Sequence, residues 1–220
     1  MESFFTNRHG GFSQGDYASW NLASHVGDDS AAVELNRAKL REQVGNFAVM
    51  SQVHGDLVAV VDQVLPEVPV ADGLITSNPD LALVVMVADC IPLLLQSKEL
   101  VAAVHVGRAG LMNSVALKTV AKMRDLGAIK ISGSIGPAIC GSCYEVPQEL
   151  HDQVVAKHPL ASSKTKRGTP ALDLPKGLVA ALAAVDVPVV ISAGCTLEDD
   201  SYFSFRRNRI TGRQAGVIKL

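Results

Sequence analysis

The stretch VVMVADCIPLLL, residues 84–95, reads as one buried apolar run interrupted by an acid and a thiol, Asp89 and Cys90. The apolar residues on either side do not alternate with polar ones, which indicates strand structure buried on both faces. A carboxylate and a thiol in such surroundings cost free energy unless they are paired or bind a ligand. Asp89 and Cys90 are therefore the first candidates for a functional site.

Further apolar, β-branched runs separated by turn residues extend on both sides of this stretch, and segments of helical spacing alternate with them. The predicted strands cover residues 46–55, 57–64, 81–90, 100–107, 129–139 and 187–195, with a last strand at the end of 201–220. The predicted helices cover residues 28–44, 111–127, 146–158 and 174–185. Residues 6–29 predict a long ordered loop, and residues 161–170 predict a mobile surface segment.

Length and composition predict a single domain over residues 1–220. Apolar residues make up 48% of the chain and charged residues 19%, which is enough for a core and excludes general disorder. The formal net charge of −2 provides no basic surface for nucleic acid. Because no signal sequence and no membrane-length apolar run is evident, we expect a cytoplasmic protein without membrane partners.

Three of the predicted strands end in residue types that bind metals: His54 in QVHG, Cys90 in ADC and His105 in AVHVG. They are too far apart in the chain for one turn to hold them, so only neighbouring strand ends can bring them together. One thiolate and two imidazoles suit zinc, and three protein ligands leave a fourth position open, as in catalytic zinc sites. From these residues alone, a core cysteine and two unrelated hydrogen-bonded histidines stay open as the alternative.

A series of motifs in a fixed order gives the chain a resemblance to the bacterial YfiH-like family, also called the laccase-domain or polyphenol oxidase family. The motifs are TNRHGGFSQGDYASWNLASHVGDD (6–29), NR (36–37), QVHG (52–55), ADGLIT (71–76), ADCIPLLL (88–95), HVGRAG (105–110), SIGPAIC (134–140), CYEV (143–146), CT (195–196) and YFSFRRNRITGRQAG (202–216). The resemblance implies that His54, Cys90 and His105 bind zinc. It also implies an α+β fold, a layered sandwich of mixed β-sheets covered by helices, similar to a bacterial toxin deamidase.

The resemblance further implies a zinc-dependent enzyme that phosphorolyses adenosine, inosine, guanosine and methylthioadenosine and also deaminates adenosine. Its partners would be a purine nucleoside and phosphate, and it would be a monomer or a small homo-oligomer. The older oxidase name of the family assumed copper, which two histidines and a cysteine can also bind. Two other classes stay open: a cysteine hydrolase with Cys90 as nucleophile and His105 as base, and a non-catalytic protein that binds a nucleotide or cell-wall precursor.

Candidate substrate-binding residues come from the same motifs. Phosphorolysis needs an anion site, and Arg8, Arg206 and Arg207 are candidates because guanidinium groups match phosphate oxygens. A solvated basic surface is the alternative for these arginines. Asn21, Gln52 and Asp72, the last of these in ADGLIT, are further polar groups of these motifs, with turn or capping roles as the alternative.

Asp89 is adjacent to Cys90, so on a regular strand its side chain would point to the opposite face. If the chain turns there, Asp89 becomes a candidate catalytic residue, either as the partner of a histidine or as a proton carrier, with a structural capping role as the alternative.

The chain departs from the family pattern after the third ligand, where the family usually reads His-Ala-Gly-Trp-Arg-Gly. Here Arg108 stands in the place of the tryptophan and Ala109 in the place of the arginine, so Arg108 is a candidate to replace that guanidinium. Cys140 and Cys143 form a C-x-x-C pair, which is compatible with redox chemistry or a second metal site. Because the sequence shows no second such pair, we expect these two cysteines to be structural.

Overall fold

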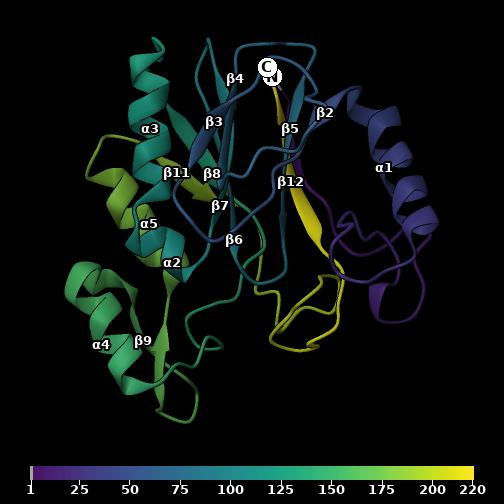
Figure 1. Cartoon of the computed structure of the whole chain (residues 1–220). Coiled ribbons are helices and arrows are strands. Elements are labelled where there is room, and N and C mark those ends of the chain that lie inside the picture. Colours follow the sequence, from purple (N-terminus) through teal and green to yellow (C-terminus); the bar gives the residue numbers. More distant parts are fainter. Residues whose placement is uncertain (1) are drawn as a thin grey trace.

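The computed structural model describes residues 2–220, in which two mixed β-sheets lie face to face and helices cover their outer faces (Figure 1). The four-stranded sheet has the order β1 (Glu2–Phe5), β12 (Gln214–Lys219), β5 (Ala82–Val87) and β2 (Phe47–Ala48). The six-stranded sheet has the order β11 (Val189–Ile191), β8 (Ser132–Ile135), β6 (Ile91–Gln96), β7 (Val101–Val106), β4 (Gly73–Thr76) and β3 (Val58–Val60). The predicted α+β sandwich of mixed sheets is confirmed.

The helices divide between the two outer faces. Helix α1 (Ser30–Val44) covers the four-stranded sheet, and α2 (Arg108–Met112), α3 (Val115–Asp125) and α5 (Leu174–Ala183) cover the six-stranded sheet (Figure 1). Helix α4 (Gln148–Lys157) lies beside the antiparallel hairpin of β9 (Ser162–Lys164) and β10 (Pro170–Leu172). Two short 3-10 turns, η1 (Gly15–Tyr17) and η2 (Pro159–Ala161), complete the elements. Within residues 2–220, none of these helices has the length and apolar character needed to cross a membrane.

Strand β5 explains why the sequence shows no polar alternation there. Its successive side chains enter two different cores: Leu83, Val85 and Val87 lie between the sheets, and Ala82, Val84 and Met86 lie on the face covered by α1. Strand β6 divides in the same way, with Leu94 between the sheets and Leu93 and Leu95 toward the helices on the other side. The prediction of strands buried on both faces is confirmed.

The stretch 84–95 is not one run but the end of β5, a turn and the start of β6. The two strands belong to different sheets, so the chain crosses from one layer to the other at residues 88–90. Asp89 adopts a φ of 93°, a left-handed conformation that is unusual for a residue with a side chain. This turn places Asp89 and Cys90 at one end of the sandwich, where loops from both sheets meet.

Several predicted boundaries need correction. The strand expected over 46–55 is confined to Phe47 and Ala48, which pair with β5, and the chain then continues as a loop through His54. The helix expected over 111–127 is two helices separated at Asn113 and Ser114, where Ser114 has a φ of 63°. The helix expected over 28–44 is confirmed as α1, with the Asp29 carboxylate accepting a hydrogen bond from the amide of Ala31 as its cap.

Candidate metal centre and adjoining pocket

His54, Cys90 and His105 come together in the fold, and their ligand atoms all lie within 4.8 Å of one another. Strands β6 and β7 are antiparallel neighbours with Pro92 opposite His105, so the turn before β6 meets the end of β7. This register brings Cys90 to His105. His54 arrives on a loop, with a φ of 56°, and its ring centroid is 4.7 Å from that of His105. The expected cluster therefore forms, although His54 is not at a strand end.

Asp72 is the residue that orients both histidines. Its buried carboxylate lies 2.7 Å from Nδ1 of His105 and accepts hydrogen bonds from the backbone amides of His54 at 3.1 Å and Gly55 at 2.7 Å. Because an ionised carboxylate only accepts, Nδ1 of His105 carries the proton, and Nε2 is left to act as a ligand. Burial alone would raise the pKa of Asp72, but the hydrogen bonds from His105 and Gly55 hold it below its ordinary value.

The protein lowers the pKa of the Cys90 thiol and raises that of His105. Burial alone would raise the pKa of Cys90, but hydrogen bonds with His105 and His54 bring it down to about 6. Burial alone would lower the pKa of His105, but hydrogen bonds with Asp72 and Cys90 raise it to about 9. At neutral pH the metal-free cluster therefore contains a thiolate beside an imidazolium, and a cation must displace the imidazolium proton to bind.

The donor set fits a divalent ion of the zinc type, and the backbone leaves room for it. A thiolate and two imidazoles are common zinc ligands, and one tetrahedral position stays open. Gly107 follows β7 directly against the cluster. A Cβ atom there would lie 2.9 Å from Nδ1 of His54 and 3.1 Å from Sγ of Cys90, so only glycine fits between these side chains.

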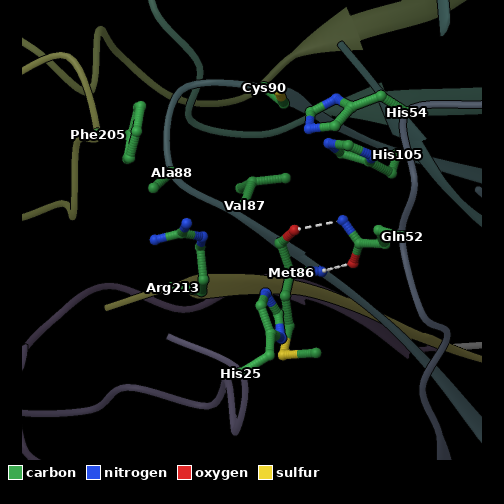
Figure 2. Close-up of a pocket in the computed structure, with 10 residues that line it drawn as sticks. All are labelled: His25, Gln52, His54, Met86, Val87, Ala88, Cys90, His105, Phe205 and Arg213. Carbon is green, nitrogen blue, oxygen red and sulfur yellow. Dashed lines mark hydrogen bonds between the residues drawn. The ribbon is translucent and has the colours of Figure 1, made fainter. Parts of the chain in front are cut away.

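The cluster opens into a cavity of about 220 Å³ (Figure 2). His25, Met86, Phe205 and Arg213 line the part of the cavity that lies away from the three ligands. A second hollow of about 350 Å³ shares His25 and Met86 with it, so the two adjoin. Concave sites with apolar walls and a few polar groups are typical of small-molecule binding.

Two of the predicted substrate residues support the pocket wall instead of offering free polar groups to it. The amide of Gln52 is bonded at both ends to the backbone of Met86, at 2.7 and 3.0 Å (Figure 2). Asn21 is buried and accepts a hydrogen bond from the backbone amide of Arg213 at 2.9 Å. It also donates to the carboxylate of Asp28 at 2.8 Å. This hydrogen bond joins the two ends of the loop segment that carries His25.

The carboxylate of Asp89 joins two loops behind the cluster. It accepts hydrogen bonds from the Thr196 hydroxyl and from the backbone amide of Arg206, both at 2.6 Å. The carboxylate that binds a histidine is that of Asp72, so Asp89 is placed to hold the turn that carries Cys90.

The three arginines predicted for the anion site have their guanidinium groups bonded to protein carbonyls, and none of them lines the cavity. Arg8 donates to Ala18 and lies over the Phe203 ring. Arg206 donates to Glu145 and lies over the Tyr144 ring, while Arg207 donates to the carbonyls of Thr196, Leu197 and Tyr202.

Sequence reasoning named Asp72 only as a polar group in ADGLIT and missed Arg213, His25 and Phe205 as pocket residues. All four lie in the motifs that carry the family resemblance. No local spacing singles them out, because they reach the pocket from the loop before β4, the loop before α1 and the segment before β12.

Comparison with known proteins shows which family the chain resembles over its whole length. A family model described as multi-copper polyphenol oxidoreductase laccase matches residues 2–220. A purine nucleoside phosphorylase of Corynebacterium glutamicum is 42% identical, with 100% of this chain and 94% of the relative covered. A purine nucleoside phosphorylase of Streptomyces griseus is 43% identical, with 98% of this chain and 93% of the relative covered.

Two solved structures superpose over almost the whole chain. A Neisseria meningitidis protein matches with a TM-score of 0.91 at 34% identity, covering 99% of this chain and 93% of that one. The YfiH protein of Bacillus licheniformis matches with a TM-score of 0.89 at 29% identity, covering 99% of this chain and 92% of that one. The layered fold is thus shared with both proteins.

Proposed function

The chain belongs to the multi-copper polyphenol oxidoreductase laccase family, which includes YfiH-like proteins, and we therefore propose that it is a purine nucleoside phosphorylase. The observation that best supports this function is a cavity that joins the His54, Cys90 and His105 cluster to a guanidinium group and an aromatic ring. A phosphorylase needs an anion site, a place for the sugar and a surface for the base. The relatives' names supply the substrate class.

We propose zinc as the ion that His54, Cys90 and His105 hold, in preference to copper. Blue-copper sites usually add a weak axial thioether to two histidines and a cysteine. The thioether of Met86 lies beside His25, away from the three ligands (Figure 2). When bound, zinc supplies a Lewis acid that polarises an oxygen atom at neutral pH.

Arg213 is the residue we assign to phosphate. Its Nη1 donates to the carbonyl oxygens of Thr211 at 2.9 Å and Gly212 at 3.0 Å, which fixes the guanidinium. Within residues 2–220 this leaves Nε and Nη2 for the oxygens of an anion in the cavity. The backbone amide of Arg213 also donates to Oδ1 of Asn21, which fixes the main chain of the residue.

The base would lie against Phe205, which lines the cavity and is 42% exposed. His25 faces the same space. Its pKa is lowered by burial and by the charges of Arg213 and Arg37, so at neutral pH it is an uncharged imidazole that can share a hydrogen bond with the base.

In the proposed reaction, a phosphate oxygen forms a bond to C1′ of the ribose while the bond from C1′ to N9 of the purine breaks. The bonding electrons leave with the base, which takes up the proton that the attacking phosphate ion gives up, and the products are ribose 1-phosphate and the free purine. Arg213 orients the phosphate and compensates its charge, and His25 and Phe205 hold the departing base. Phosphorolysis of methylthioadenosine and deamination of adenosine are part of the same proposal for this pocket.

The test is to incubate adenosine, inosine, guanosine and methylthioadenosine with and without phosphate and to separate the bases, ribose phosphates and deaminated nucleosides by chromatography. We expect phosphate-dependent base release by the wild type and loss of at least 100-fold in Cys90→Ala, the scale on which one activating group acts. Metal content measured on the same samples should show zinc. Base release at the same rate with and without phosphate, or at the wild-type rate in Cys90→Ala, would contradict the proposal.

A cysteine hydrolase is the second candidate, because Asp72, His105 and Cys90 also form the chain of contacts used to activate a nucleophile. That function needs a free thiolate. It predicts protein without metal that is inactivated as fast as Cys90 is alkylated, whereas the phosphorylase proposal predicts that zinc protects Cys90.

A further inference from the structure

A second group of metal-binding side chains lies outside the pocket. Cys140, Cys143, Cys195 and Glu198 each place one donor atom within 4.8 Å of the others, and all three cysteines are free thiols. We propose that these four residues form a second, structural zinc site, which is independent of the phosphorylase assignment.

The pattern of the four residues is C-x-x-C followed by C-x-x-E, at positions 140–143 and 195–198. Two such short pairs from separate loops are the usual construction of structural zinc sites, because each pair places two donors on one turn. The second pair is not another C-x-x-C, because a carboxylate, that of Glu198, stands in the place of its last cysteine. Three thiolates and one carboxylate complete a tetrahedron from protein ligands alone, so no position is left for a substrate.

The backbone holds both loops in place for such a site. The turn at 140–143 is closed by the amide of Cys143 donating to the carbonyl of Cys140 at 3.0 Å, and the amide of Cys140 points to Sγ of Cys195 at 3.3 Å. Ala138 pairs with Cys195 as an isolated bridge between the two loops. Gly141 is needed within the turn, because a Cβ atom there would lie 2.7 Å from Cβ of Asp173.

Lys166 is the neighbouring cation. Its ammonium lies 2.7 Å from Oε1 of Glu198, and its side chain is 79% exposed. Three thiolates and a carboxylate around a divalent ion leave a net negative charge, which Lys166 partly compensates from the outside. The cluster thus has donors of the right type, a short-pair pattern and a compensating charge.

A zinc ion at this position would fasten the two loops that support the first cluster. Thr196 follows Cys195 and donates to the carboxylate of Asp89, next to Cys90. Tyr144 follows Cys143, and the guanidinium of Arg206 lies 5.0 Å from its ring centroid. The second site would therefore act on the first by positioning, without touching the substrate.

The test uses Cys90→Ala, in which the first cluster lacks its thiolate, so that bound metal reports on the second site. Purified with zinc, a phosphine reductant and no chelator, this variant should retain one zinc per chain, and adding Cys195→Ser should remove it. Replacement of zinc by cobalt in Cys90→Ala should give strong thiolate-to-cobalt absorption that disappears with Cys195→Ser. If the ratio of zinc to protein chain were the same with and without Cys195→Ser, the proposal would be overturned.

Two exposed positions keep the test decisive if Cys195→Ser fails to fold. Glu198→Gln should raise the dissociation constant for zinc at least about tenfold, the loss that replacing groups behind metal ligands already produces. Arg167→Ala removes a neighbouring exposed cation, whose partner is Glu145, and no ligand, so its zinc content should equal that of the parent. Equal zinc affinity in Glu198→Gln and its parent, or reduced cysteines that take up no zinc and form a Cys140–Cys143 disulfide on exposure to air, would overturn the proposal.

Discussion

The carboxylate of Asp72 fixes two of the three ligands of the first cluster, through Nδ1 of His105 at 2.7 Å and the backbone amide of His54 at 3.1 Å. One buried acid therefore determines both the protonation of one imidazole and the path of the loop that carries the other.

Asp72→Asn should lower zinc affinity by about 10- to 100-fold, because the amide no longer accepts the Nδ1 proton as a carboxylate does. The matched control is Asp152→Asn, since Asp152 makes a similar contact with Nδ1 of His151, at 3.0 Å, on the surface. Titration with a competing chelator measures the zinc affinity of both variants. Equal affinities in the two variants would show that Asp72 does not control the ligands.

Gly107→Ala should prevent metal binding at the first cluster with little change in the fold, because the added methyl group would crowd Nδ1 of His54 and Sγ of Cys90. Gly194→Ala is the control, because a Cβ atom there meets open space. The measurement is protection of Cys90 from alkylation by added zinc, read by peptide mass spectrometry. Full protection in Gly107→Ala would show that the neighbouring side chains move aside easily.

In metal-free protein, alkylation of Cys90 should be half-maximal near pH 6 and close to its plateau at pH 7.5. The thiol reacts as the thiolate, and its pKa in the folded protein is about 6 instead of the ordinary 9. Above about pH 9 His105 loses its proton and the charge pair is lost, although the thiolate remains. A rate that still rises tenfold per pH unit between 7 and 8 would mean that the histidines do not stabilise the thiolate.

Arg213→Ala should raise the KM for phosphate by about 10- to 100-fold, since a hydrogen-bonded charge contributes roughly 1.5–3 kcal/mol to anion binding. Arg8→Ala removes the same charge at a position outside the cavity and should change this KM by less than about threefold. Initial rates at varied phosphate and saturating nucleoside separate the two variants. An identical effect of both substitutions would indicate only a general loss of positive charge.

The apolar pattern was sufficient to predict the doubly buried strands, because β5 and β6 each contribute to cores on both of their faces. It could not show that residues 84–95 belong to two sheets. Both halves of that stretch are equally apolar, and the left-handed turn at Asp89 depends on bonds to Thr196 and Arg206, more than 100 residues away.

By itself, the sequence determined the residue chemistry of the first cluster: a thiol in an apolar run and two histidines after apolar runs, in the order of a known family. Only the tertiary structure decided that Asp72 orients His105, that Arg213 and Phe205 line the pocket, and that Cys195 and Glu198 join Cys140 and Cys143. Residue type and local spacing can be read directly from the sequence, whereas these contacts depend on how the two sheets bring distant loops to one end of the sandwich.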